Sequence, residues 1–255
     1  MQRYFISETN WSKKSVQIRG DDAHHIQRVM RFEVGDEIIC NHPNGRVASC
    51  TISKISKQTV EATIDQWIDE NRELPVQVTI AQGLPKGGKF EWVLQKGTEL
   101  GAHAFIPFQA ERSVVKWNSK KAQKKQQRFE RIVKEASEQC HRNKIPTIRP
   151  LMAMDELLEE STSYDVKIFA YEQQTERPHD QSFASIIKRL EMDQKVLVCI
   201  GPEGGFSENE ATVLTDNDFI PVRLGPRILR TETAPLYVLA SISYHIEELQ
   251  LTSLK

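Results

Sequence analysis

The sequence predicts an α/β protein with a small β-rich domain at its N-terminus and a larger domain built on a mainly parallel sheet. Three patterns indicate this: short alternating apolar runs before about residue 70, alternating strand-like and helix-like runs after it, and two late strands that end in glycine-bearing loops. Strand–helix alternation favours a parallel sheet covered by helices on both faces. The polar stretch Asp69–Pro75 separates the two patterns, so we place the domains at residues 1–72 and 73–255.

Five strands and one helix are expected in the N-terminal region, which suggests a small barrel. The strands are predicted at Arg3–Ile6, Ser15–Ile18, Glu37–Asn41, Arg46–Ile55 and Thr59–Trp67. Asn44-Gly45 lies between the third and fourth runs, and this pair is typical of a hairpin turn. The helix should span about Asp21–Met30, with Asp21 as its N-cap.

The remainder alternates strands with helices. Strands are expected at Val76–Gln82, His103–Phe108, Val166–Tyr171, Val196–Ile200 and Phe219–Leu224. Helices are expected at Phe90–Leu100, Lys120–Gln139, Phe183–Leu190 and Ala234–Leu249, and Ser207 with Glu210 has the spacing of a capping box that begins another. The last helix is apolar over much of its circumference, which predicts deep packing or a subunit interface.

The composition is that of an ordinary globular protein: 255 residues, 27% charged and 39% hydrophobic. The net charge of −1 argues against binding polyanions over the whole surface but allows local basic patches. No signal peptide or membrane-spanning run is recognisable, and four scattered cysteines indicate reduced thiols. Cys40, His42 and Cys50 lack the spacing of a closed zinc site. We therefore expect a cytoplasmic protein with no metal and no membrane association.

The stretch Lys195–Pro235 carries the strongest signal for a ligand. Gly201-Pro202-Glu203-Gly204-Gly205 follows a buried strand directly, and its glycines allow close approach of the backbone or positive φ angles. The loop is neither a phosphate-binding P-loop nor a dinucleotide fingerprint. Taken alone, it is explained equally well as a tight turn.

Two further loops change that balance. Gly225–Thr233 follows the next strand with two arginines, a carboxylate and hydroxyls, and Tyr171-Glu172 ends a third strand. In open α/β sheets, ligands bind outside the carboxyl ends of the strands. The sequence therefore predicts a ligand site where these three loops meet.

Several motifs resemble one family. GPEGGFS and LGPRILRTETAP are similar to segments of the RsmE-type ribosomal RNA methyltransferases of the SPOUT superfamily, and the similarity extends over nearly the whole chain. It includes HHIQRVMRFEVGDEI at His24–Ile38, KGGKFEWVLQKGTELG, AERSV at Ala110–Val114 and ERIVKEASEQCHRNKIP at Glu130–Pro146. His141 stands where the family pattern more often has glycine.

The resemblance implies a SPOUT-type α/β domain with a trefoil knot, a PUA-like N-terminal barrel and a homodimer. It also implies S-adenosylmethionine (SAM) as cofactor and, as substrate, N3 of uridine 1498 in the 16S ribosomal RNA of the small subunit. A noncatalytic RNA-binding or ribosome-associated module that retains the fold is the alternative. The intact glycine loops argue against that alternative.

The same resemblance assigns residues. It implies that SAM is held by Tyr171, Glu172, Ile200, Gly201, Pro202, Glu203, Gly204, Gly205, Leu224, Gly225, Ile228, Leu229, Arg230, Thr233 and Ala234. Removing the proton from uracil N3 requires a base and a cation for the charge left behind. Arg230, Glu232, Glu203 and Arg112 are the candidates, although loop carboxylates such as Glu232 also cap helices.

Four basic residues are candidates for RNA contacts. Arg28 and Arg31 follow two histidines on the predicted N-terminal helix and suit phosphate contacts, or else form a solvated helix face. Lys86 and Lys89 flank two glycines before a helix, a position that suits a phosphate or only a flexible turn. The lysine run after residue 119 is typical of a solvated surface.

Overall fold

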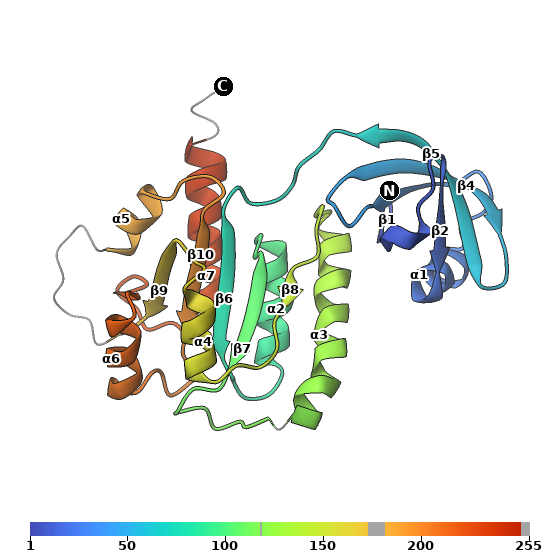
Figure 1. Ribbon diagram of the computed structural model, residues 1–255. Coiled ribbons are helices and arrows are strands. Elements are labelled where there is room, and N and C mark those ends of the chain that lie inside the picture. The colour runs from blue at the N-terminus through green and yellow to red at the C-terminus, as the bar shows by residue number, and fades with distance from the viewer. Residues whose placement is uncertain (118, 173–181, 251–255) are drawn as a thin grey trace. The chain divides into compact units, whose positions relative to one another are not determined.

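The computed structural model describes residues 1–117, 119–172 and 182–250 (Figure 1). The chain divides into two compact units. The first contains Met1–Glu73 and Ser137–Ile145, and the second contains Leu74–Ala136 and Pro146–Lys255. The return of the chain to the first unit at Ser137–Ile145 was not indicated by the sequence. The functional division between residues 72 and 73 stays a prediction.

The first unit is built on a five-stranded sheet in the order β1-β3-β4-β5-β2. Its strands are β1 (Arg3–Phe5), β2 (Ser15–Arg19), β3 (Glu37–Asn41), β4 (Val47–Ile55) and β5 (Thr59–Ile68), with a short 3₁₀ turn at Glu8–Asn10. Only β1 and β3 pair in parallel, and the other neighbours are antiparallel. All five predicted strands are confirmed within about a residue. Alternate strand residues and Ile26 form the core.

The hairpin and the helix of this unit differ in how well they were predicted. The Asn44-Gly45 turn is confirmed: Gly45 has a φ of 91°, and the His42 N–H donates to the Arg46 carbonyl at 2.8 Å. The helix is α1 (Gly20–His24), which continues as a π-helical turn over His25–Met30. The prediction of Asp21 as N-cap is wrong. The chain enters the helix at Gly20, after extended Arg19, so Asp21 already lies in the first turn.

The second unit contains a six-stranded parallel sheet in the order β11-β9-β10-β6-β7-β8. Its strands are β6 (Gln77–Gly83), β7 (Ala104–Phe108), β8 (Thr147–Ile148), β9 (Val166–Ala170), β10 (Lys195–Ile200) and β11 (Ile220–Val222). Its helices are α2 (Lys89–Glu99), α3 (Ser119–Gln139), α4 (Met154–Ser161), α5 (Phe183–Lys188), α6 (Glu208–Asp216) and α7 (Ala234–Ser243), the last continuing as a π-helical turn over Tyr244–Gln250.

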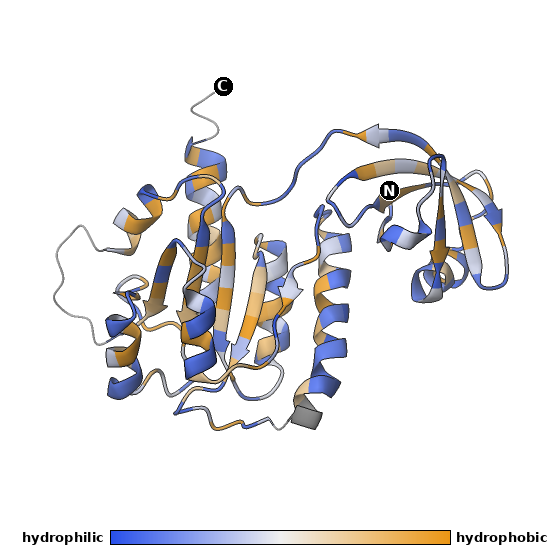
Figure 2. Ribbon diagram, viewed as in Figure 1, coloured by the Kyte–Doolittle hydropathy of each residue, from blue (hydrophilic) through white to orange (hydrophobic). Residues whose placement is uncertain are grey.

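The helices cover both faces of this sheet. On β10, Val196 and Val198 pack with residues of α2, α3, α5 and α7, whereas Leu197 and Cys199 pack with residues of α4 and α6. This alternation is the period-two pattern of a strand buried on both sides. Figure 2 shows the apolar strands between helices whose outer faces are polar. The predicted three-layer α/β architecture is confirmed.

Two elements, α4 and β8, were not predicted. β8 has only two residues. The N-cap of α4 is Ala153, which makes no side-chain cap hydrogen bond; the Glu156 carboxylate instead accepts the Ala153 N–H at 2.7 Å and holds the first turn. Among the residues described, no helix combines the length and apolarity needed to cross a membrane.

Candidate active site

A pocket of about 450 Å³ lies at the carboxyl edge of the parallel sheet. The three loops singled out in the sequence follow β9, β10 and β11, which are neighbours in the sheet, and residues of all three line the pocket. Lys89 and Arg112 reach the same pocket from the segments after β6 and β7. The structure therefore places the three predicted polar loops together at one edge of the sheet.

The glycine loop forms one wall because its backbone folds tightly on itself. The Gly205 N–H donates to the Pro202 carbonyl at 2.9 Å, and Gly205 has a φ of 67°. A Cβ on Gly201 would lie 3.0 Å from the Gly205 carbonyl carbon, a contact that a larger residue could not make without displacing the loop. The loop feeds α6 through the predicted capping box, since Ser207 and Glu210 exchange hydrogen bonds of 3.1 and 2.9 Å.

Two fully buried polar side chains join this wall to the loop after β11. The Thr231 hydroxyl donates to the Gly201 carbonyl at 2.6 Å, and the Gln82 amide donates to that hydroxyl at 2.9 Å. Sequence reasoning assigned no role to Gln82. The available signal was an amide at the end of a buried strand in which Val78, Ile80 and Ala81 are apolar, because buried polar groups are normally hydrogen-bonded.

An ion cluster lies at the mouth of the pocket. The Lys89 ammonium contacts Glu203 at 2.9 Å and Glu232 at 3.3 Å, and the Lys86 N–H donates to Glu203 at 3.1 Å. All three charged side chains are 20–30% exposed. Lys89, considered from the sequence as a phosphate ligand, thus lies between two of the predicted catalytic carboxylates.

The cluster shifts the titration of two of its members. Burial acts to raise the pKa of the Glu203 carboxyl, but hydrogen bonds from Lys89 and from backbone N–H groups outweigh it and hold that pKa below its ordinary value. The hydrogen bond to Glu203, with help from Glu232, raises the pKa of the Lys89 ammonium. Both groups are therefore charged at neutral pH.

The two predicted catalytic arginines differ in their contacts. Arg112 donates to the Gly204 carbonyl at 3.2 Å and packs so closely that a Cβ on Gly204 would lie 3.1 Å from its own Cβ. Arg230 lines the pocket, is exposed, and has no side-chain hydrogen bond or ion pair to any other described residue. In the described part of the chain, Arg230 pairs with neither Glu203 nor Glu232. Such a pair would have made Arg230 a purely structural residue.

Most of the other predicted cofactor residues meet at this pocket. It is lined by Tyr171, Glu172, Ile200, Gly201, Pro202, Glu203, Gly204, Gly205, Leu224, Ile228, Leu229, Arg230 and Ala234. Gly225 and Thr233 belong to the same loop but do not line the pocket. Gly225 turns the chain with a φ of 78°, and Thr233 is the residue before the first turn of α7.

The predicted RNA residues Arg28 and Arg31 belong to the first unit. Arg28 lines a hollow of about 450 Å³ together with Arg19 and Lys57, and none of the described carboxylates lines it. Arg31 lies outside that hollow, at the end of the π-helical turn, with a φ of 56°. The structure therefore separates two residues that the sequence had paired.

The pocket supplies backbone polar groups and apolar side chains for a small molecule, and its charged lining includes the carboxylates and cations described above. Such a set can accept a proton and stabilise a developing negative charge. The charged residues concerned are Lys89, Arg112, Glu203, Arg230 and Glu232. Among the described residues, no group of three or more His, Cys, Asp or Glu side chains is placed to hold a metal ion.

Comparison with known proteins gives consistent results. A family model of RNA methyltransferase domains matches residues 72–243, and one of RNA methyltransferase PUA domains matches residues 18–65. The chain is 47% identical over 253 residues to ribosomal RNA small subunit methyltransferase E of Bacillus subtilis strain 168, covering 98% of this chain and 99% of that one.

Two solved structures with a bound cofactor are also similar. One is a ribosomal RNA small subunit methyltransferase E from Neisseria gonorrhoeae bound to SAM, with a TM-score of 0.83, 28% identity and coverage of 95% of this chain and 97% of that one. The other is a methyltransferase from Legionella pneumophila in complex with SAM, with a TM-score of 0.83, 29% identity and coverage of 94% and 96%.

Proposed function

The chain belongs to the ribosomal RNA small subunit methyltransferase E family, and we propose that it transfers a methyl group from SAM to N3 of a specific uridine in 16S ribosomal RNA. The observation that carries the proposal is the pocket of backbone-rich loops with an ion cluster at its mouth. The family's target position, uridine 1498, is the expected substrate.

The pocket residues fit the cofactor. Gly201 and Gly204 sit where a Cβ would press against the loop backbone or Arg112, so the glycines keep open a cradle of backbone groups. Ile200, Leu224 and Leu229 would provide apolar walls for the cofactor, and Gln82 and Thr231 hold the two loops together. SAM, when bound, supplies a methyl group activated by its sulfonium charge.

Glu232 is the better candidate for the base. Glu203 accepts hydrogen bonds from Lys89 and from the Lys86 N–H, and its lowered pKa makes it a weak proton acceptor. Glu232 has a single ion pair at 3.3 Å, and its other carboxylate oxygen accepts no hydrogen bond from a described residue. A base needs a free oxygen within reach of the proton it takes. We assign Glu203 the role of positioning Lys89.

Arg230 and Lys89 provide the positive charge that the reaction requires. Loss of the N3 proton leaves negative charge on the flanking uracil oxygens, which preorganised donors stabilise. Arg230 has donors at the pocket that no described residue uses, and the fork of its guanidinium suits an oxyanion. Arg112 braces the Gly204 backbone and so shapes the cofactor wall.

The proposal includes a homodimer with a knotted cofactor domain. Tyr237, Tyr244 and Leu249 are large side chains on the C-terminal helix and its π-helical extension that stay at least 40% exposed. Exposed apolar side chains gathered on one element favour an interface, and a two-fold interface uses the same patch twice. The SPOUT resemblance adds the trefoil knot around the cofactor loops.

The first unit is proposed to hold the RNA, and the enzyme to act in the cytoplasm on the small ribosomal subunit. Arg28, Arg19 and Lys57 form a hollow lined by cations, and such a hollow suits phosphate groups. The functional boundary is placed between residues 72 and 73, within the polar stretch Asp69–Pro75.

Two measurements test the function. Mass spectrometry of modified nucleosides should show loss of N3-methyluridine from 16S ribosomal RNA in cells that lack the protein, and its recovery on re-expression. Calorimetry should show SAM binding by the wild type and its loss in Gly204→Val and Gly225→Val, because the first displaces Arg112 and the second cannot easily adopt the positive φ. Unchanged methylation in the deletion strain would contradict the proposal.

A further inference from the structure

A stack of four side chains lies on the first unit. The rings of Trp11 and Trp67 are 5.5 Å apart and nearly parallel, and His42 packs against Trp11 at 5.1 Å. The guanidinium carbon of Arg46 lies 3.7 Å from the centre of the Trp67 ring, so Arg46 ends the stack. Arg46 belongs to the β3–β4 hairpin and Trp67 to β5.

The donors of Arg46 are unused within the described chain. Its backbone N–H bonds to Asn44, but its guanidinium makes no hydrogen bond or ion pair to a described residue. The residue is exposed, and Trp67 is 40% exposed beside it. A guanidinium held over an aromatic ring at this distance is oriented by that ring, which leaves its N–H groups available to a ligand.

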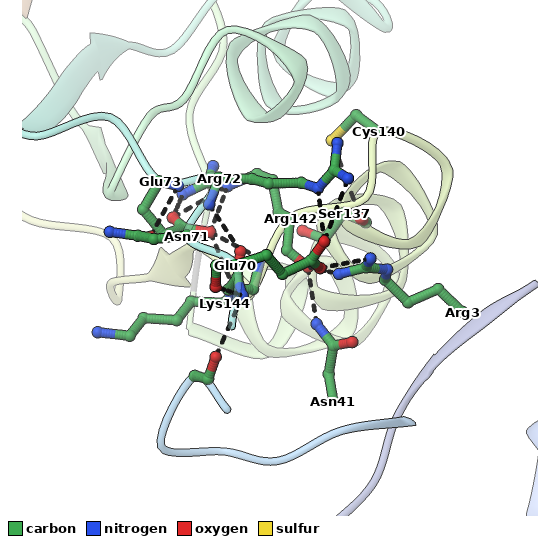
Figure 3. Close-up of polar contacts among 12 residues, drawn as sticks. Arg3, Asn41, Glu70, Asn71, Arg72, Glu73, Ser137, Cys140, Arg142 and Lys144 are labelled. Atoms are coloured by element: carbon green, nitrogen blue, oxygen red, sulfur yellow. Dashed lines mark hydrogen bonds and ion pairs between the residues drawn. The ribbon is translucent and has the colours of Figure 1, made fainter. Parts of the chain in front are cut away.

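A second cation is held beside this hairpin by the segment Ser137–Ile145. Figure 3 shows the buried network that fixes the segment: Arg142 pairs with Glu73, and the Arg142 carbonyl accepts the Asn41 amide at 2.7 Å. Asn143 then donates to the Gly45 carbonyl at 3.2 Å. The Lys144 side chain runs over the turn, with its Cε 3.0 Å from where a Cβ on Gly45 would lie.

The carboxylates of this network are compensated by cations and N–H groups, so they would not repel a bound anion. Glu73 is engaged by Arg142 and by the N–H groups of Asn143 and Lys144. Burial acts to raise the pKa of Glu70, but Arg3 and Arg72 outweigh it and keep that pKa low, so its charge is matched by theirs. The Lys144 ammonium has no hydrogen bond or ion pair to a described residue. The surface presented by Arg46 and Lys144 is therefore cationic.

We propose that Arg46, Trp67 and Lys144 form a contact surface for single-stranded RNA, which we call the hairpin platform. An unpaired base stacks on the Arg46 guanidinium, and Lys144 contacts a neighbouring phosphate. Sequence-tolerant recognition of single strands combines stacking on planar side chains with cations that follow the backbone. Double-stranded RNA offers no free base face and is bound less well. This inference rests on the proposed function, since it names how the RNA substrate is held.

The test uses the full chain and a fluorescently labelled single-stranded oligouridylate, with a duplex of equal length as the comparison. Arg46→Ala should weaken binding of the single strand by about tenfold or more, the range for loss of one stacked base. Arg46→Lys should restore little, because it keeps the charge and loses the flat fork. Lys144→Ala should reduce the slope of log affinity against log salt by about 0.7. Lys54→Ala, an exposed lysine on β4 of the same unit, is the charge-matched control.

SAM affinity and thermal unfolding are measured for every variant, so that a folding defect is recognised. If Arg46→Ala and Lys144→Ala bind the single strand like wild type, the hairpin platform is overturned. The proposed function is judged separately, and methylation of small subunits by the wild-type protein upholds it. Equal loss in Arg46→Ala and Lys54→Ala would also overturn it, since general charge would then explain the effect. A wild-type protein that neither binds RNA nor methylates small subunits would overturn both.

Discussion

Two ion clusters in this protein use the same residue types in opposite ways. In the first unit, Arg142 is buried and pairs with Glu73, whose side chain is 17% exposed, and both belong to a network of hydrogen bonds that includes Arg3 and Glu70 (Figure 3). At the pocket, Lys89 lies between Glu203 and Glu232 with 20–30% of each side chain exposed. The first cluster fastens a returning segment of chain, and the second leaves an oxygen of Glu232 without a donor among the described residues.

The comparison separates structural charges from chemical ones. A buried pair whose groups are all engaged is strongly destabilising to break, because removing one partner leaves the other charged and desolvated. A partly exposed cluster adds little stability. Its incomplete hydrogen bonding instead leaves groups that can exchange a proton or meet a developing charge. Substitutions in the two clusters should therefore affect different observables.

Breaking the buried cluster should have the largest effect. Arg142→Ala leaves Glu73 without its main partner and should lower the free energy of unfolding by about 3–5 kcal/mol. Urea denaturation followed by tryptophan fluorescence measures this, since Trp11 and Trp67 lie in the same unit. SAM affinity should stay unchanged.

Arg149→Ala is the matched control, because Arg149 pairs with Glu160 at 3.0 Å while remaining 47% exposed. An exposed pair of that kind contributes about 0–1 kcal/mol. A loss as small in Arg142→Ala as in Arg149→Ala would remove the distinction between the buried network and surface pairs.

Removing the proton acceptor from the pocket cluster should slow chemistry without unfolding the protein. Glu232→Gln keeps the shape and loses the charge, and it should reduce single-turnover methyl transfer by about 10³-fold, within the range for general bases. Glu203→Gln is the isosteric control and should cost less, since Glu203 is committed to Lys89 and backbone donors. A larger defect in Glu203→Gln than in Glu232→Gln would assign the base to Glu203 and the positioning of Lys89 to Glu232.

The cofactor loops were predictable from sequence because backbone requirements are visible as glycines. GPEGG after a buried run, and a capping box at Ser207 and Glu210, specify a strand, a tight turn and a helix start through local chemistry alone. The parallel order of the strands then brings the loops together at one edge. Of the predicted cofactor positions, only Gly225 and Thr233 do not line the pocket.

Contacts between residues distant in sequence were not predictable. Lys89 and Glu203 are 114 positions apart, so no local pattern pairs them. The same holds for Arg142 and Glu73, which join the Ser137–Ile145 segment to the first unit. His141 has a φ of 62°, a conformation that glycine adopts most readily, which gives a physical reason for the glycine that the family more often carries there.

Loss of Arg230 should weaken transition-state stabilisation more selectively than loss of the base. Arg230→Ala should slow methyl transfer by about 10²–10³-fold, or roughly 3–4 kcal/mol, at saturating RNA and SAM. SAM affinity should change little, because the Arg230 side chain makes no hydrogen bond or ion pair to a described residue and so does not shape the loop. Arg227→Ala, in the same loop and also exposed at the pocket, is the control. A normal rate in Arg230→Ala would exclude the catalytic role, and lost SAM affinity would make it a residue of the cofactor wall.

The smallest expected effect is the pH-dependent contribution of the Lys89–Glu203 pair to stability. Lys89→Met keeps the side-chain stem and removes the charge, so it should destabilise the protein by less than about 1 kcal/mol near neutral pH. The pKa of Glu203 is held below its ordinary value of 4.5, so the contribution is present above that value and is lost as the pH falls through the lowered pKa. The pKa of Lys89 is raised above 10.5, so at the alkaline end the contribution is lost as the pH rises through the raised pKa.

Urea denaturation of wild type and Lys89→Met across a pH series measures this difference, with Lys188→Met, an exposed lysine on α5, as the control. The difference should be flat between the two limits and shrink beyond each. A difference that persists unchanged at acid pH would show that pairing with ionised Glu203 is not its source, since Lys89→Met keeps the stem and Glu203 is then protonated. In that case the pH-dependent contribution assigned to the Lys89–Glu203 pair would be excluded, and the proposed contrast between the two clusters would rest on catalysis alone.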